Sequence, residues 1–161
     1  MSQALRFIST AIRSGQHKAL FASKPTIASL VQHVVVPNVS LRAHELELFE
    51  DDPLEYIRLD LSLPLSSSGS GAADITTRRQ AAADVLQALV SSGYEADTTE
   101  IVGEWINKGL RIYSEDKSVD GEGWRAKDSA IYLLNAIATR GATVKVCLGY
   151  LAGSHGVMTR L

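Results

Sequence analysis

Cysteine is almost absent from this sequence, because Cys147 is the only one among its 161 residues. A single cysteine excludes a disulfide within the chain and a zinc site built from several thiolates, and it is typical of a reducing compartment. Long apolar runs are also missing, since none reaches the roughly 18 residues that a membrane-spanning helix needs. The apolar N-terminal stretch is interrupted by Arg6, unlike the core of a secretory signal peptide. We therefore expect a soluble, intracellular protein without membrane insertion.

Neither sign of charge dominates the chain, which has 16 Lys and Arg against 18 Asp and Glu. The sequence therefore lacks the basic stripe that is typical of proteins that bind nucleic acid. The Gly/Ser-rich stretch 66–71 has neither the lysine nor the strand–helix setting of a phosphate-binding loop. The four histidines show no metal-ligand spacing. We therefore expect no catalysis and no cofactor or metal ion.

An acidic segment, residues 42–60, is the most unusual stretch that is present. It contains seven carboxylates and only two arginines, and apolar residues alternate with the charged ones. A solvated charge run would not carry this much apolar surface, so we interpret the segment as an insertion that packs on its own scaffold and presents negative charge outward. An acidic surface loop without a partner explains the residue types equally well. The carboxylates are Glu45, Glu47, Glu50, Asp51, Asp52, Glu55 and Asp60.

Arg78 and Arg79 open a helix just after this insertion. Arginines in the first turn lie at the unfavourable end of the helix dipole, which hints at a compensating carboxylate nearby. The two side chains could pair with the insertion or with a partner protein. Solvent exposure is the outcome that we expect for them from sequence.

Five stretches have the apolar periodicity of amphipathic helices, and no convincing strand appears. We expect Pro37 to end the second helix, because proline disfavours the helical conformation of the preceding residue. Thr77 and Gln80 match a capping box at the start of the third helix, and Asp97 is a candidate N-cap of the fourth. The expected helices span residues 2–13, 25–36, 77–92, 98–114 and 124–140.

The same periodicity predicts buried positions. We expect Ile27, Val31 and Val35 on the buried face of the second helix and Gly93 as the end of the third. In the last two helices we expect packing between helices at three positions: Tyr113, Trp124 and Ile131.

These helices are spaced like the helix pairs of an α-solenoid. Successive first helices begin about 46 residues apart, at 77 and about 123, within the roughly 40–47-residue period of HEAT and armadillo repeats. Each pair needs a neighbour to cover its apolar face. The sequence therefore predicts an all-α, HEAT/armadillo-like solenoid fragment of about two and a half helix pairs with an acidic insertion. A closed helical bundle is the alternative architecture.

Three collinear blocks of sequence carry a family resemblance. The insertion block 36–60, the block 74–82 (DITTRRQAA) and the block 124–133 (WRAKDSAIYL) resemble the exportin-2 family of the importin-β superfamily. Members of that family return importin-α from the nucleus to the cytoplasm. The chain departs from the family pattern at Leu46, where an acidic residue is usual, and at Leu59, where arginine is usual.

The resemblance implies a HEAT-repeat carrier that shuttles through the nuclear pore between nucleus and cytoplasm. Its implied partners are importin-α and the GTP-bound Ran GTPase, and the family's insertion touches Ran. A carboxylate-rich surface attracts a basic partner and steers its approach. The seven carboxylates, together with Arg78 and Arg79, are therefore the candidate partner-contact residues. A generic HEAT scaffold without a transport role is the alternative function.

The resemblance also divides the chain. We expect residues 1–141 to be the carrier segment, with an insertion at 37–76 that contains a flexible tract at 62–73. The tail 142–161 has no capped amphipathic helix where one should begin. We expect this tail to be disordered or to result from a misjoined gene model.

Overall fold

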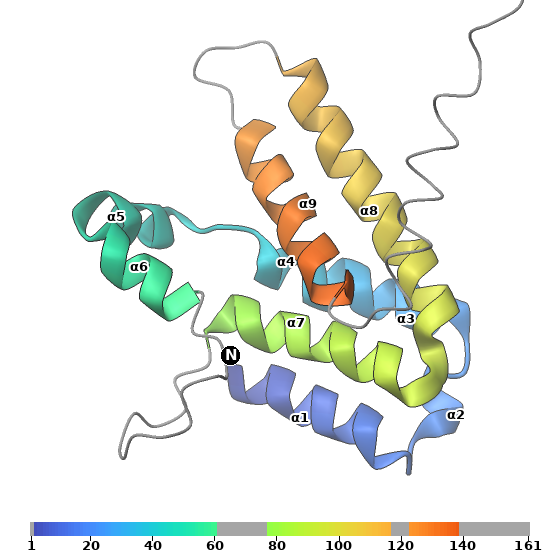
Figure 1. Cartoon of the computed structure of the whole chain (residues 1–161). Helices are drawn as coiled ribbons and strands as arrows, with labels where there is room; N and C mark the ends of the chain where they lie inside the picture. The colour runs from blue at the N-terminus through green and yellow to red at the C-terminus, as the bar shows by residue number, and fades with distance from the viewer. Residues whose placement is uncertain (1, 61–76, 117–122, 139–161) are drawn as a thin grey trace, which may run out of the picture.

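The computed structural model describes residues 2–60, 77–116 and 123–138, and all regular structure in these ranges is helical (Figure 1). The predicted all-α class and the order of helix pairs are confirmed. The helices are α1 (Ser2–Ser14), α2 (Lys18–Phe21), α3 (Lys24–Leu30), η1 (Val31–Val35), α4 (Val36–Val39), α5 (Ala43–Asp51), α6 (Pro53–Asp60), α7 (Arg78–Leu89), η2 (Val90–Tyr94), α8 (Glu95–Glu115) and α9 (Gly123–Ala138).

The closest packing joins successive helix pairs. Helix α7 lies along α1, and α9 lies along α8, while α3 and α4 run behind α7 and α9 (Figure 1). Small residues explain these approaches: Ala81, Ala82 and Ala88 of α7 are fully buried. At Gly109 of α8 an added Cβ atom would lie 2.7 Å from the carbonyl oxygen of Ala126 in α9. These helices together with α3, η1 and α4 bury one continuous apolar core, and we refer to them as the helical body.

The prediction that Pro37 ends its helix is wrong, because the helix continues to Val39. A wide π-type turn precedes the proline, and within it the N–H of Val36 donates to the carbonyl of Val31. The side chain of Asn38 donates to the carbonyl of Val34 at 2.7 Å. A widened turn and a side-chain donor are recognised ways to accommodate a proline that has no N–H.

The helix after the insertion begins as predicted. The Thr77 hydroxyl accepts from the N–H of Gln80 at 3.2 Å, and the Gln80 amide oxygen accepts from the N–H of Thr77 at 2.9 Å. Gly93 has a positive φ of 97° and turns the chain into α8. Asp97 is not the N-cap of α8, because the helix already begins at Glu95 and Asp97 lies in its first turn.

Three residues of the last two helices are more exposed than their expected positions imply. Tyr113, Trp124 and Ile131 are 43–46% exposed, whereas the apolar periodicity predicts that they pack between helices. Ala130 and Ile137 of the expected stripe of α9 are buried, and Leu133 joins them in place of Ile131.

Some predictions concern residues outside the described ranges. The tract 62–73 and the tail 142–161 both lie there, so their expected disorder stays a prediction. Within the described residues, no helix is long and apolar enough to cross a membrane.

Candidate partner-binding site on the acidic hairpin

The acidic segment forms two short helices, α5 and α6, joined by Asp52, and we call this unit the acidic hairpin. The Glu45 carboxylate accepts from the N–H of Arg42 and caps the start of α5, at 2.8 Å. The Asp52 carboxylate accepts from the N–H of Glu55 and caps α6, at 3.0 Å. The rings of Phe49 and Tyr56 meet edge to face, with centroids 5.5 Å apart. Local capping and one aromatic contact therefore define the hairpin.

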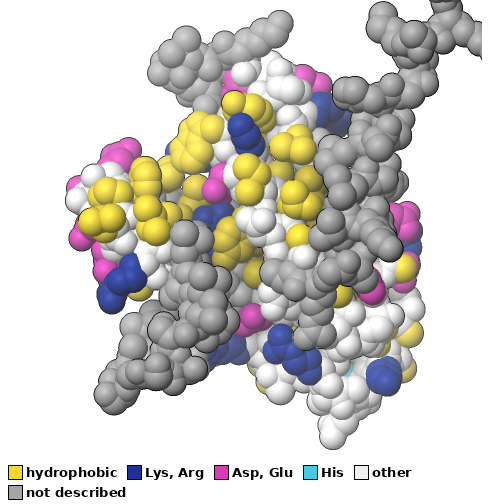
Figure 2. All heavy atoms as spheres, in the orientation of Figure 1, with side chains coloured by type: hydrophobic (Ala, Val, Ile, Leu, Met, Phe, Trp, Pro, Cys, Tyr) yellow, Lys and Arg dark blue, Asp and Glu magenta, His cyan; other side chains and the backbone are white. Residues whose placement is uncertain are grey.

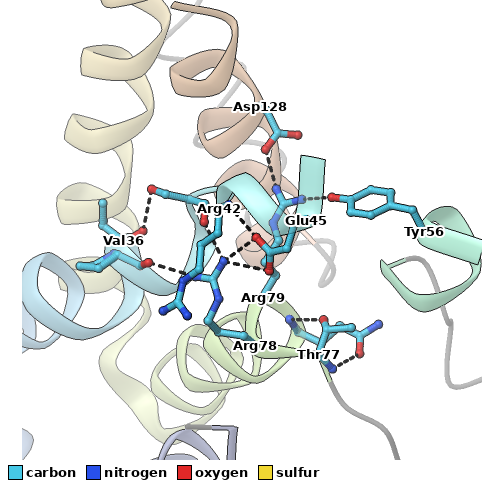
Figure 3. Close-up of polar contacts among 11 residues, drawn as sticks. Val36, Arg42, Glu45, Tyr56, Thr77, Arg78, Arg79 and Asp128 are labelled. Carbon is cyan, nitrogen blue, oxygen red and sulfur yellow. Dashed lines mark hydrogen bonds and ion pairs between the residues drawn. The ribbon is translucent and has the colours of Figure 1, made fainter. Parts of the chain in front are cut away.

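Arg78 ties the start of the hairpin to the end of α4 (Figure 3). Its guanidinium donates to the carbonyls of Pro37 and Ser40, at 3.0 and 2.8 Å. It also pairs with the Glu45 carboxylate at 2.8 Å. Cations are favourable at a helix C-terminus, where carbonyl groups lack partners. One side chain thus satisfies the end of α4 and holds the first turn of α5.

Arg79 ties the end of the hairpin to α9 (Figure 3). It donates to the Tyr56 hydroxyl of α6 at 3.1 Å and to the Asp128 carboxylate of α9 at 2.6 Å. Its guanidinium carbon lies 4.1 Å from the centroid of the Tyr132 ring, which is cation–π geometry. Gln80 adds a hydrogen bond from its amide to the carbonyl of Leu59 at 3.0 Å.

The expectation that both arginines face solvent is wrong, because Arg78 and Arg79 are only 9% and 3% exposed. The compensating carboxylates that the helix dipole suggested are present as Glu45 and Asp128. Burial lowers the pKa of the Arg78 guanidinium, and Glu45 acts in the opposite direction. Burial likewise raises the pKa of the Asp128 carboxyl, and Arg79 offsets only part of this effect.

Six of the seven candidate carboxylates fall into two groups. In the first group, Glu45 pairs with Arg78 and Glu55 pairs with Arg58. The hydrogen bond from Arg58 lowers the pKa of the Glu55 carboxyl. The other group forms no ion pair within the described residues and is exposed; it consists of Glu47, Glu50, Asp51 and Asp52. Asp60 is the last residue of α6.

Apolar side chains share the exposed surface of the acidic hairpin. Leu48, Phe49, Leu54 and Ile57 are 36–79% exposed. Figure 2 shows hydrophobic side chains over the hairpin with acidic side chains around their edge. Such a mixed surface suits contact with another protein. In the described part of the chain, no group of three His, Cys, Asp or Glu residues could hold a metal ion.

Sequence reasoning missed three residues that hold the hairpin: Tyr56 and Tyr132 as partners of Arg79, and Gln80 beyond its role in the capping box. The signal for a buried partner was the position of two arginines at a helix N-terminus. The identities of the partners depend on tertiary contacts, because Asp128 lies 49 residues from Arg79 in sequence.

Comparison with known proteins agrees with the helical fold. The family model described as Cse1 matches residues 1–152, which reaches beyond Gly141, where we expected the resemblance to end. Exportin-2 of Drosophila melanogaster and exportin-2 of Homo sapiens are each 37% identical to the chain over 145 residues. These matches cover 90% of the chain and 14% of each relative.

A solved structure, described as the exportin Cse1 in its cargo-free, cytoplasmic state, superimposes with a TM-score of 0.70 at 34% identity. It covers 84% of this chain, which in turn spans 13% of that protein. The predicted solenoid architecture is therefore confirmed. The family match over most of the chain, the sequence identity and the shared fold lead to one conclusion: the chain belongs to the Cse1 family of exportins, which are nuclear transport receptors.

Proposed function

We propose that this chain acts as the central segment of a receptor that carries importin-α out of the nucleus together with the GTP-bound Ran GTPase. The observation that carries the proposal is the exposed group of Glu47, Glu50, Asp51 and Asp52 on a hairpin that buried arginines fix to the helical body. We assign the contact with Ran to these four carboxylates. A receptor with this role shuttles between nucleus and cytoplasm.

The position of the carboxylates supports a role in binding. Glu50 and Asp51 lie in the last turn of α5, which has no basic residue. Negative charge at a helix C-terminus opposes the helix dipole and costs stability. Residues that break a local stability rule without compensation are expected at functional sites. Partner contact gives Glu50 and Asp51 a use that folding does not.

The electrostatic role follows from their exposure. Carboxylates in water interact weakly with distant charges, and salt screens them. Clustered on one surface, they still accelerate the approach of a basic partner and disfavour an acidic one. The apolar residues beside them, such as Phe49 and Ile57, supply area that a bound partner can bury.

The test uses a graft, because the chain spans about 14% of the relatives it matches. Residues 1–141 of this chain replace the matching segment of human exportin-2, and binding of Ran and importin-α is measured by biolayer interferometry. The variant Glu47→Gln, Glu50→Gln, Asp51→Asn, Asp52→Asn is expected to weaken binding of GTP-loaded Ran about tenfold at low salt, with a smaller effect at high salt.

A matched control separates the site from net charge. Glu104 and Glu115 are exposed glutamates on α8, so Glu104→Gln with Glu115→Gln removes the same charge as Glu47→Gln with Glu50→Gln. Only the hairpin pair is expected to weaken Ran binding. Equal affinities for all variants at low salt would overturn the contact assignment. A graft that binds neither protein would favour the scaffold function.

A further inference from the structure

The acidic hairpin is attached to the rest of the molecule by polar contacts around two arginines. Helices α5 and α6 pack more extensively on each other than on any other described helix. No residue of α5 is fully buried. The hairpin therefore lacks the apolar interface that fixes the helices of the body, and polar contacts at Arg78, Arg79 and Gln80 set its position.

Arg79 differs from Arg78 in what it connects. Arg78 contacts the end of α4 and Glu45 of α5, two helices that follow one another in the chain. Arg79 instead stands on α7 and contacts α6 and α9 together, through Tyr56 and through Asp128 and Tyr132. Helix α6 belongs to the insertion, α7 is the helix that follows it, and α9 belongs to the next helix pair. One buried guanidinium is thus shared by three separate parts of the fold.

The chemistry of the guanidinium suits this shared position. Its planar fork donates in several fixed directions while its face stacks on an aromatic ring, so the partners constrain one another's geometry. An ammonium group has no comparable fork. A shift of α9 that moves Asp128 must therefore move Arg79 or break a contact. If Arg79 moves, the hydrogen bond that holds Tyr56 changes with it. If the contact breaks, Arg79 loses the acceptor that orients its guanidinium toward Tyr56.

We infer that Arg79 is the positioning residue of the acidic hairpin, and that its guanidinium couples the orientation of α5 and α6 to the position of α9. Bending between α7 and α9 is transmitted to the hairpin through Asp128, Arg79 and Tyr56. This coupling arises from contacts within the chain and does not depend on the identity of a partner.

Hydrogen exchange of the full chain, measured by mass spectrometry, tests the coupling. Asp128→Ala removes the acceptor on α9, and we expect exchange of the α5 and α6 amides to accelerate about tenfold, since low-stability units open independently of the core. In an Arg79→Lys background the hairpin already exchanges faster, and Asp128→Ala is expected to add almost nothing. Such non-additivity identifies residues that act through one contact.

Two comparisons guard against a general loss of stability. Glu100→Gln removes an ion pair on the surface of the helical body, in which the Lys24 Nζ lies 2.6 Å from the Glu100 Oε1. This variant should leave hydrogen exchange of the hairpin unchanged. Amides of α1 and the centre of α7 should stay protected in Arg79→Lys. The inference is overturned if Asp128→Ala leaves the hairpin unchanged, or if it accelerates exchange equally with Arg79 and with lysine. Loss of protection in α1 together with the hairpin would also overturn it.

Discussion

Side chains such as Ile27, Val85 and Leu86 are fully buried in the helical body, whereas none of residues 43–59 in the acidic hairpin is fully buried. The body is stabilised by apolar area removed from water, a force without directional preference. The hairpin is positioned by hydrogen bonds and ion pairs, which depend on angle and distance. The two regions should therefore respond differently to the same kind of substitution.

The helical body and the acidic hairpin therefore differ in how strongly they resist displacement. Close-packed apolar cores resist small displacements. A unit that depends on a few charge-assisted hydrogen bonds has one favoured orientation and loses it when those bonds break. The chain thus combines a rigid helical body with an acidic hairpin whose orientation depends on a few hydrogen bonds and ion pairs.

The largest effect is expected from a cavity in the body. Leu86 of α7 is fully buried, so Leu86→Ala should lower the free energy of unfolding by about 2–5 kcal/mol through lost burial and the remaining cavity. Urea denaturation followed by circular dichroism measures this change. Leu54→Ala in the hairpin is the matched control, because Leu54 is 79% exposed and should change stability by less than about 0.5 kcal/mol. Similar losses for both variants would remove the distinction between the regions.

A smaller and more local effect is expected at Arg78. Arg78→Met keeps a long side chain but removes the pair with Glu45 and the bonds to two carbonyls. Mutational studies give about 1.5–3 kcal/mol for a hydrogen bond to a charged group. We therefore expect Arg78→Met to lower the free energy of opening of α5 by a similar amount. Hydrogen exchange measures it by region.

The control for Arg78 is a second arginine. Arg111→Met alters an exposed arginine of α8 and should leave α5 unchanged. Faster exchange throughout α1 and α7 in Arg78→Met, with no preference for α5, would show that Arg78 supports the body rather than the hairpin.

The smallest effect is a pH dependence at Asp128. Because burial raises the folded-state pKa of Asp128 above its ordinary value of 3.8, the folded chain binds this proton more tightly than the unfolded chain does. The resulting stability is fully present below the unfolded pKa and is lost as pH rises through the folded pKa. The wild type should therefore lose stability relative to Asp128→Asn as pH rises through this window.

Parallel urea titrations of the two proteins across the acidic range measure that difference. A difference that stays constant would show that pairing with Arg79 balances the cost of burial. One that grows in favour of the wild type as pH rises would show that pairing outweighs this cost.

Local signals predicted much of the body. The capping box at Thr77, the apolar stripe of Ile27, Val31 and Val35, and the turn at Gly93 all act over a few residues. The errors came from tertiary contacts. Helix α9 turns Leu133 inward rather than Ile131, and Pro37 is tolerated because of the wide turn before it.

The candidate site was only partly predictable for the same reason. Charge density marked residues 42–60, but it did not separate Glu45, which is committed to Arg78, from exposed Glu47. That separation depends on which carboxylate faces a guanidinium 33 residues away in sequence. The buried role of Arg79 likewise required Asp128 and Tyr132 to meet it in space.

Gly109 has a consequence for how successive helix pairs stack. Its missing side chain lets α8 approach the backbone of α9 at Ala126, where a Cβ atom would meet the carbonyl oxygen at 2.7 Å. In a solenoid, the small rotation between neighbouring repeats accumulates into superhelical curvature. Replacement of Gly109 by alanine would therefore force α8 and α9 apart and change the rotation between the two helix pairs.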